Sequence, residues 1–279
     1  MRETSNPVFR SLPKQQGGYA QFGTGAAQMQ AYQANPYAPY QDTRDVPATR
    51  PMTIDDVVTK TGITLAVLTA VAAVSYYLSS SSPALASLLT MVGSFGGLAM
   101  VLIATFGRKQ DNPGIVLTYA ALEGLFLGSF SFVFANTYVR GVSAGALISE
   151  AVVGTLGVFF GMLVVYKTGA IRVTPRFTRM LVAAMFGVLA LMIVDLVVGL
   201  FTHGGGLGIR SGGPLAIIFS LVCIGIAALS FLTDFDSADQ MIRAGAPEKA
   251  AWGVALGLTV TLVWMYVEML RLFSYFQND

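Results

Sequence analysis

The chain alternates between long apolar runs and short polar breaks from about residue 58 onward. No charged side chain occurs between Lys60 and Arg108, a stretch that contains two such runs. A helix needs about 20 apolar residues to cross a bilayer, at a rise of roughly 1.5 Å per residue. Seven runs meet that length. The predicted spans are 58–78, 84–106, 114–136, 144–166, 180–201, 214–233 and 250–273.

None of these runs shows the ten-residue alternation of a membrane barrel strand, so helices are the structure that satisfies the backbone in lipid. The sequence therefore predicts an all-α integral membrane protein with seven transmembrane helices. Pairs of glycines four residues apart favour close helix packing. These pairs are Gly93 and Gly97, Gly124 and Gly128, Gly157 and Gly161, and Gly253 and Gly257.

The first 56 residues differ from the rest of the chain. They are rich in Gln, Gly, Ala, Pro and Tyr, and they lack an apolar run near their start. Such a segment cannot bury enough apolar surface to offset its chain entropy. We therefore expect residues 1–56 to be a disordered cytoplasmic tail rather than a signal peptide, followed by a helical domain over 57–276.

Composition supports the membrane assignment and excludes several functions. Hydrophobic residues make up 54% of the chain and charged ones 11%, against roughly 25% charged in soluble domains. The net charge of +2 is too small to suggest a nucleic-acid partner. Cys223 and His203 are the only residues of their types, so we expect no disulfide, metal-ligand cluster or cofactor. Both residues are expected to be structural.

The basic residues predict an orientation. If the N-terminus is inside, 14 of the 17 Lys and Arg residues lie on the inner side, and three (Arg140, Arg210 and Arg271) lie on the outer side. This bias follows the positive-inside rule for an odd number of spans. We expect a protein of the cytoplasmic membrane, with its N-terminus on the cytoplasmic side and Asp279 on the outside.

Acidic residues occur inside the predicted spans, whereas no basic residue lies near the middle of one. Four acids lie within spans, namely Glu123, Glu150, Asp195 and Glu268. A further group, Asp234, Asp236 and Asp239, closes the sixth span at its inner end. A charge at the bilayer centre costs about 2.5–3.5 kcal/mol on insertion scales. A carboxylate there must be protonated, share a proton or neutralise a cation. The pattern therefore indicates that protons or metal cations are handled within the membrane.

Counting the helical rise places these acids at different depths. Glu123 lies roughly 15 Å from the inner boundary, near the midplane. Glu268 and Asp195 fall in the outer third, Glu150 lies one or two turns below the outer surface, and Asp234 begins the inner group. If the side chains face one interior, they form a ladder for a cation or a proton.

Each acid also has a purely structural interpretation. Glu268 and Arg271 are three residues apart, which is the spacing of a salt bridge on one helix face. Glu150 could be open to water at the interface, and Asp195 could hydrogen-bond a neighbouring helix. The inner acids could form a solvated helix end. Glu123, with no partner nearby in sequence, is the hardest to explain in this way.

The C-terminal quarter of the chain resembles the signature of the Bax inhibitor-1 family, in its bacterial YccA-like branch. The matching parts are Asp234-Phe235-Asp236, the turn Gly245-Ala246-Pro247, and the stretch Tyr266-Val267-Glu268-Met269-Leu270-Arg271. The seven-helix layout and the polar tail are similar too, so the resemblance covers about residues 55–276.

This resemblance implies six helices around a central seventh and a pH-sensitive calcium leak, with a gate held by one acid from each of the last two spans. Here those acids would be Asp234 or Asp236, and Glu268. The separation along the chain puts Asp236 and Glu268 at depths about 15–20 Å apart, too far for contact unless the last span lies deeper. The alternative is that Glu268 meets Asp195 or Glu150.

The sequence thus favours a passive, pH-gated cation pathway, with calcium as the ion that suits carboxylate oxygens best. Glu268 is expected to be essential, Arg271 to be its ion-pair partner, and Asp234 and Asp236 to tune the pH response. The alternative is a non-transporting regulator of a membrane-bound protease or a stress response, acting through the tail and the cytoplasmic loops. The sequence contains no nucleophile–base set or phosphate-binding loop, so we expect no enzyme.

Overall fold

The computed structural model describes residues 50–137, 143–202 and 206–277 of the chain. The helices are α2 (Ile54–Ser79), α3 (Pro83–Phe106), α4 (Pro113–Thr137), α5 (Ala144–Thr168), α6 (Pro175–Phe201), α7 (Pro214–Arg243) and α8 (Ala251–Phe276), with a 3₁₀ turn η2 (Glu248–Ala250) before α8. Seven helices in these residues are long and apolar enough to cross a membrane. The predicted all-α fold with seven spans is therefore confirmed. His203, Arg140 and Asp279 lie outside the described residues.

The helices begin where the sequence supplies capping groups. The side chains of Thr53, Ser143 and Thr174 accept hydrogen bonds from the first turns of α2, α5 and α6. Proline occupies the first turn of α3, α6 and α7, where its missing N–H leaves no broken bond. α7 continues to Arg243, so Asp234 and the acids after it lie on the helix rather than in a loop.

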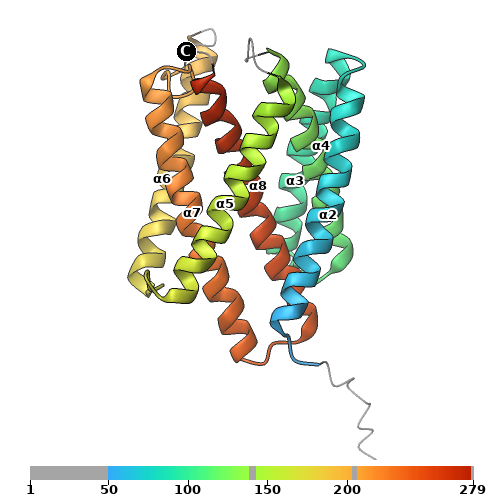
Figure 1. Ribbon diagram of the computed structural model, residues 1–279, viewed down its shortest axis with the longest axis vertical. Helices are drawn as coiled ribbons and strands as arrows, with labels where there is room; N and C mark the ends of the chain where they lie inside the picture. The colour runs from blue at the N-terminus through green and yellow to red at the C-terminus, as the bar shows by residue number, and fades with distance from the viewer. Residues whose placement is uncertain (1–49, 138–142, 203–205, 278–279) are drawn as a thin grey trace, which may run out of the picture. The chain divides into compact units, whose positions relative to one another are not determined.

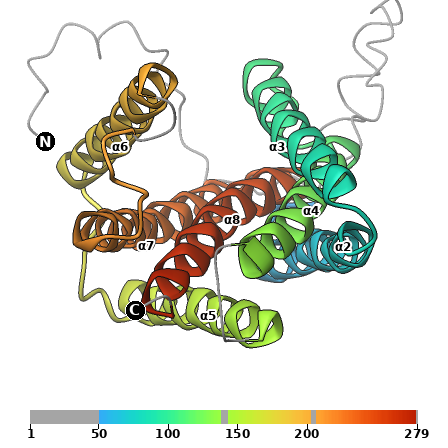
Figure 2. The ribbon, with the colours of Figure 1, turned by 90° about the horizontal axis from the view of Figure 1, so that it is seen from above.

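The last helix, α8, runs through the middle of the bundle. It packs against α2, α4, α5 and α7, whereas α3 packs mainly on α4 and α6 mainly on α7 (Figure 2). Phe231 of α7 and Met265 and Leu270 of α8 are fully buried in the core that these contacts form. The last helix is therefore central, as expected, with four helices packed directly against it and α3 and α6 outside these four.

Two of the four glycine pairs lie where helices approach closely. A Cβ added at Gly124 or Gly128 would overlap the backbone of α2, and one added at Gly93 would overlap the backbone of α4. Gly157 has no atom of another element within 4 Å of such a Cβ, and neither has Gly161. The expectation that all four pairs bring helices together is therefore wrong for this pair.

One end of the bundle carries most of the described ion pairs. We call it the basic end; there α2 begins, and there α3 joins α4, α5 joins α6, and α7 joins α8 (bottom of Figure 1). Lys249 Nζ lies 2.7 Å from Asp111 Oδ2 and so ties the start of α8 to the α3–α4 connection.

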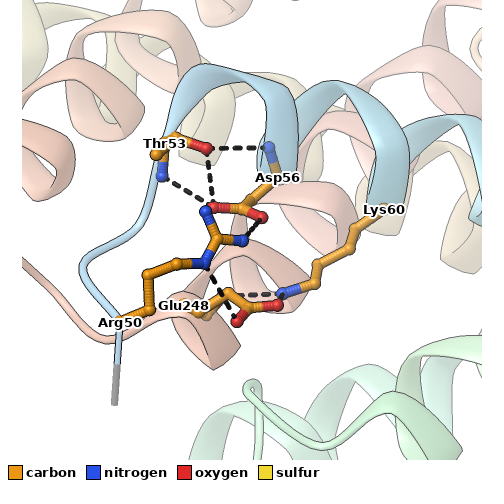
Figure 3. A network of polar contacts seen from close by, with 5 residues as sticks. All are labelled: Arg50, Thr53, Asp56, Lys60 and Glu248. Carbon is orange, nitrogen blue, oxygen red and sulfur yellow. Dashed lines mark hydrogen bonds and ion pairs between the residues drawn. The ribbon is translucent and has the colours of Figure 1, made fainter. Parts of the chain in front are cut away.

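A second set of contacts at the basic end joins the residues before α2 to the turn before α8 (Figure 3). Arg50 Nη2 lies 2.6 Å from Asp56 Oδ1, and Lys60 Nζ lies 3.3 Å from Glu248 Oε1. The Met52 N–H also donates to the Ala246 carbonyl at 2.8 Å. Residues 50–56 therefore belong to the helical unit, and its boundary lies earlier than the expected residue 57. The disorder expected for the tail stays a prediction, because residues 1–49 lie outside the described residues.

Candidate functional site

Asp234 lies against a cavity that opens at the basic end. The cavity has a volume of about 460 Å³ and lies between α7, α8 and the α3–α4 connection. Arg108 and Asp111 line it together with Gln110 and Ser237. Gly257 of α8 also lines it, and a Cβ there would meet nothing within 4 Å. This glycine leaves space beside the carboxylate rather than bringing two helices together.

The Asp234 carboxylate is held by α8. The Thr261 hydroxyl donates a hydrogen bond of 2.7 Å to Asp234 Oδ2. Among the described residues, no Lys, Arg or His forms a salt bridge with Asp234. A half-buried carboxylate with one hydroxyl partner thus faces the cavity without a salt bridge, and Arg108 lines the same cavity.

Asp236 and Asp239 have different surroundings on the same helix. The Tyr166 hydroxyl of α5 lies 3.5 Å from Asp236 Oδ1 and 3.3 Å from Asp239 Oδ2. Gln240 Nε2 donates to Asp236 at 2.6 Å, and Arg243 pairs with Asp239 at 2.7 Å. These two acids are therefore held toward α5 by polar partners, separately from Asp234.

Glu268 is buried near the opposite end of α8, with an exposed fraction of 1%. Arg271 Nη1 donates to Glu268 Oε1 at 2.8 Å, and the Ser220 hydroxyl of α7 donates to Oε2 at 3.3 Å. The Arg271 guanidinium also lies 5.9 Å from the centre of the Phe130 ring. This geometry matches the salt-bridge interpretation of Glu268 and Arg271.

The acid pair implied by the family resemblance does not form a direct contact. Asp234 bonds to Thr261, which precedes Glu268 by seven residues and so lies about 10 Å from it along α8. The alternative partners of Glu268 are also wrong in this structure. Asp195 accepts from the Leu207 N–H at 2.7 Å, and Glu150 accepts from Gln277 Nε2 at 2.8 Å.

Glu123 lies at the interface of α3 and α4. Its carboxylate lies against Gly97 of α3, and it has the Tyr119 hydroxyl of its own helix as a hydrogen-bond partner. Asp195 instead bonds to the connection after α6. The acids are thus distributed over separate interfaces. Glu123 and Asp195 do not face one common interior with the other acids, as a ladder of carboxylates for a cation or a proton would require.

Sequence reasoning missed the hydroxyl partners of the acids. Thr261, Ser220 and Tyr166 come from helices other than those of the acids they bind. The spacing of Thr261, two turns before Glu268 on the same helix face, is the one local signal that could have indicated Thr261. No local pattern distinguishes Ser220 or Tyr166 from the other hydroxyl residues of the spans.

Comparison with known proteins agrees with this architecture. A family model described as Bax inhibitor 1 like matches residues 6–278, nearly the whole chain. An uncharacterized protein of Chlamydia muridarum (strain MoPn / Nigg) is 28% identical over 166 residues, which cover 58% of this chain and 61% of that protein. The matched part thus spans less than two thirds of that relative. Because this family model covers the whole helical bundle, the protein belongs to the Bax inhibitor 1 like family.

Proposed function

We propose that the protein is a pH-sensitive passive pathway for cations, with calcium as the preferred ion, in the cytoplasmic membrane. The observation that carries this proposal is the Asp234 carboxylate, which faces the 460 Å³ cavity with the Thr261 hydroxyl as its partner. The basic end would face the cytoplasm, as the distribution of 14 of the 17 basic residues favours. The cavity would then be the cytoplasmic entrance.

A carboxylate without a salt bridge that faces a cavity within the membrane tends to bind either a proton or a metal cation. The Thr261 hydroxyl bond alone does not neutralise its charge. Protons and cations therefore compete for Asp234. As the pH falls, protonation removes the charge and cation entry decreases, which gives the pathway its pH sensitivity.

The ligands at this site suit the passage of a cation better than its tight binding. Calcium prefers six to eight oxygen ligands in a tight site. Within the part of the chain that the structure describes, no group of three His, Cys, Asp or Glu side chains is placed to hold a metal ion. Asp234 and the neighbouring hydroxyls would bind calcium weakly, and weak binding lets an ion leave as readily as it enters.

The ion pair of Glu268 and Arg271 supplies a barrier further along α8. Its two side chains have exposed fractions of 1% and 13%, so the pair is largely shielded from solvent in this state. The guanidinium also repels a cation that approaches from Asp234. The closed state would therefore be held by the pair, and opening would require Arg271 to move away from the path.

Cation flux through purified protein in liposomes, measured across pH, tests the proposal. We expect Asp234→Asn to reduce calcium flux strongly at neutral pH and to abolish most of its pH dependence. Thr261→Val keeps the carboxylate and removes its hydrogen bond, so it should shift the pH of half-maximal flux instead. Asp239→Asn is the matched control, because Asp239 lies on the same helix but pairs with Arg243 outside the cavity.

Two outcomes would contradict the proposal. The first is unchanged flux in the Asp234→Asn protein, and the second is equal loss in the Asp234→Asn and Asp239→Asn proteins. If the wild-type protein carries no cation flux at any pH, the alternative function as a regulator of a membrane-bound protease gains support.

A further inference from the structure

A second cavity lies between α2 and α5 and is apolar. Its volume is about 680 Å³, within the range of roughly 300–1,000 Å³ typical of small-molecule sites. α4 and α8 form its floor, with Leu262 and Tyr266 of α8 among the lining residues. α2 and α5 do not pack as a pair, and α8 is visible between them in Figure 1. The cavity is therefore a groove between two membrane-spanning helices.

We propose that this groove binds one acyl chain of a bilayer lipid. The proposal does not depend on the cation pathway, since the groove and the Asp234 cavity share no lining residue. Four features of the groove determine its occupant, namely its depth in the membrane, its width, its polarity and its position at a membrane boundary.

The depth of the groove matches one leaflet. Its lining runs over residues 65–76 of α2 and 145–156 of α5, which is about 16 Å along each helix. Half of the hydrocarbon core is about 15 Å thick. Gly145 is the second residue of α5 and lies at the end opposite the basic end. The groove thus begins at that membrane boundary and ends near the midplane.

The groove is wide enough for a single extended hydrocarbon chain. A volume of 680 Å³ over a length of about 16 Å gives a mean cross-section of about 40 Å².

The polarity of the groove selects hydrocarbon. Its lining contains no charged side chain. The hydroxyls of Ser131 and Tyr266 bond to each other at 2.7 Å, and the Thr155 hydroxyl donates to the Ala151 carbonyl at 2.7 Å. These hydroxyls therefore have partners within the protein, and a lipid headgroup would find no charge to bind at this depth.

A photoreactive lipid tests the proposal. The protein is reconstituted in vesicles of phosphatidylethanolamine and phosphatidylglycerol that contain a phosphatidylethanolamine with a diazirine at the middle of one acyl chain. After irradiation, mass spectrometry locates the adducts. We expect adducts on Leu262, Val263 or Tyr266, because Leu262 and Tyr266 are only 6% and 9% exposed and bulk lipid does not reach them.

Matched substitutions separate the groove from the general lipid-facing surface. Val152 lines the groove and its neighbour Val153 does not, although both are exposed. Val152→Phe should abolish the α8 adducts, and Val153→Phe should leave them. Ala73→Phe in the groove and Ala70→Phe outside it repeat the comparison on α2, so the test survives if one variant fails to fold.

The proposal is overturned if adducts appear solely on the outward faces of α3 and α6, or if folded Val152→Phe and Ala73→Phe proteins keep the α8 adducts. Protein–protein cross-links between α2 or α5 and a second copy, with no lipid on α8, would assign the groove to an oligomer interface instead.

Discussion

Glu268 and Arg271 form an ion pair one turn apart on the central helix, with 2.8 Å between Oε1 and Nη1. The Glu268 side chain is buried and that of Arg271 is only 13% exposed, and Ser220 of α7 donates the second hydrogen bond to the carboxylate. Removing one member of a buried pair leaves the other charge uncompensated, whereas removing both leaves none. The pair is therefore a stability determinant, and in the proposed cation pathway it would also be a barrier beyond Asp234.

The first prediction concerns this pair. Glu268→Gln should lower the free energy of unfolding by about 3–5 kcal/mol, because the Arg271 charge stays buried without a partner. The double variant Glu268→Gln/Arg271→Met should recover most of that loss, as measured by denaturant unfolding in detergent micelles.

Flux through the double variant separates two roles for Glu268. If the pair is a barrier, the folded double variant should conduct more than the wild-type protein at rest. If Glu268 itself handles the ion, the double variant stays defective. Unaltered flux in both the single and the double variant would contradict both roles.

The second prediction concerns helix packing at glycine. Gly128→Ala should lower the free energy of unfolding by about 1–3 kcal/mol, because the new methyl group overlaps the Ala72 carbonyl of α2. Gly157→Ala is the control, since a Cβ there meets nothing within 4 Å. Alanine is the better helix former, so this control should be neutral or slightly stabilising. Equal losses at the two positions would show that the α2–α4 approach is not the cause.

The third prediction concerns pH at the mouth of the Asp234 cavity. The hydrogen bond from Lys249 lowers the pKa of Asp111 below its ordinary value. A carboxyl group with a lower pKa in the folded state stabilises the fold above the unfolded pKa near 4, and this stabilisation is lost as the pH falls through the folded pKa. Because the pair is partly exposed, the effect should stay below about 1 kcal/mol.

Lys249→Met is the variant that tests this pH dependence. It should lower the melting temperature slightly at pH 7, and the difference from the wild-type protein should shrink as the pH falls below 4. A difference that grows at low pH would refute the assignment of Asp111 as the titrating partner.

The fourth prediction concerns the segment before α2. Deleting residues 2–48 should leave the thermal stability of the bundle nearly unchanged, because that segment lacks apolar periodicity. Extending the deletion through residue 52 should destabilise the bundle by about 2 kcal/mol, since it removes the Arg50 ion pairs and two backbone hydrogen bonds to the turn before α8. Thermal unfolding of both truncated proteins measures the difference, and a large loss from the shorter deletion would contradict it.

The fifth prediction concerns orientation. Lys109→Cys at the basic end should react with a membrane-impermeant maleimide only after cell lysis, and Ser81→Cys at the opposite end should react in intact cells. Cys223 is buried and should give little background. The reverse labelling pattern would invert the topology and place the Asp234 cavity on the outside.

The sequence by itself determined the number of spans, the class of fold and the family. The spans and the class of fold follow from local composition, because a run of about 20 apolar residues has to form a helix in lipid wherever its neighbours are. The family followed instead from the resemblance of the motifs in the last two spans. The ion pair of Glu268 and Arg271 was also predictable, since residues three apart on a helix meet on one face.

Only the tertiary structure decided which hydroxyl groups the acids contact and that Asp234 faces a cavity. Asp234 and Thr261 are 27 residues apart, and Ser220 and Glu268 are 48 apart. Their contacts depend on how α7 rotates against α8, which hydrophobicity alone does not specify because every face of a buried apolar helix looks similar in sequence. The two cavities depend on packing as well, because each lies where neighbouring helices fail to meet.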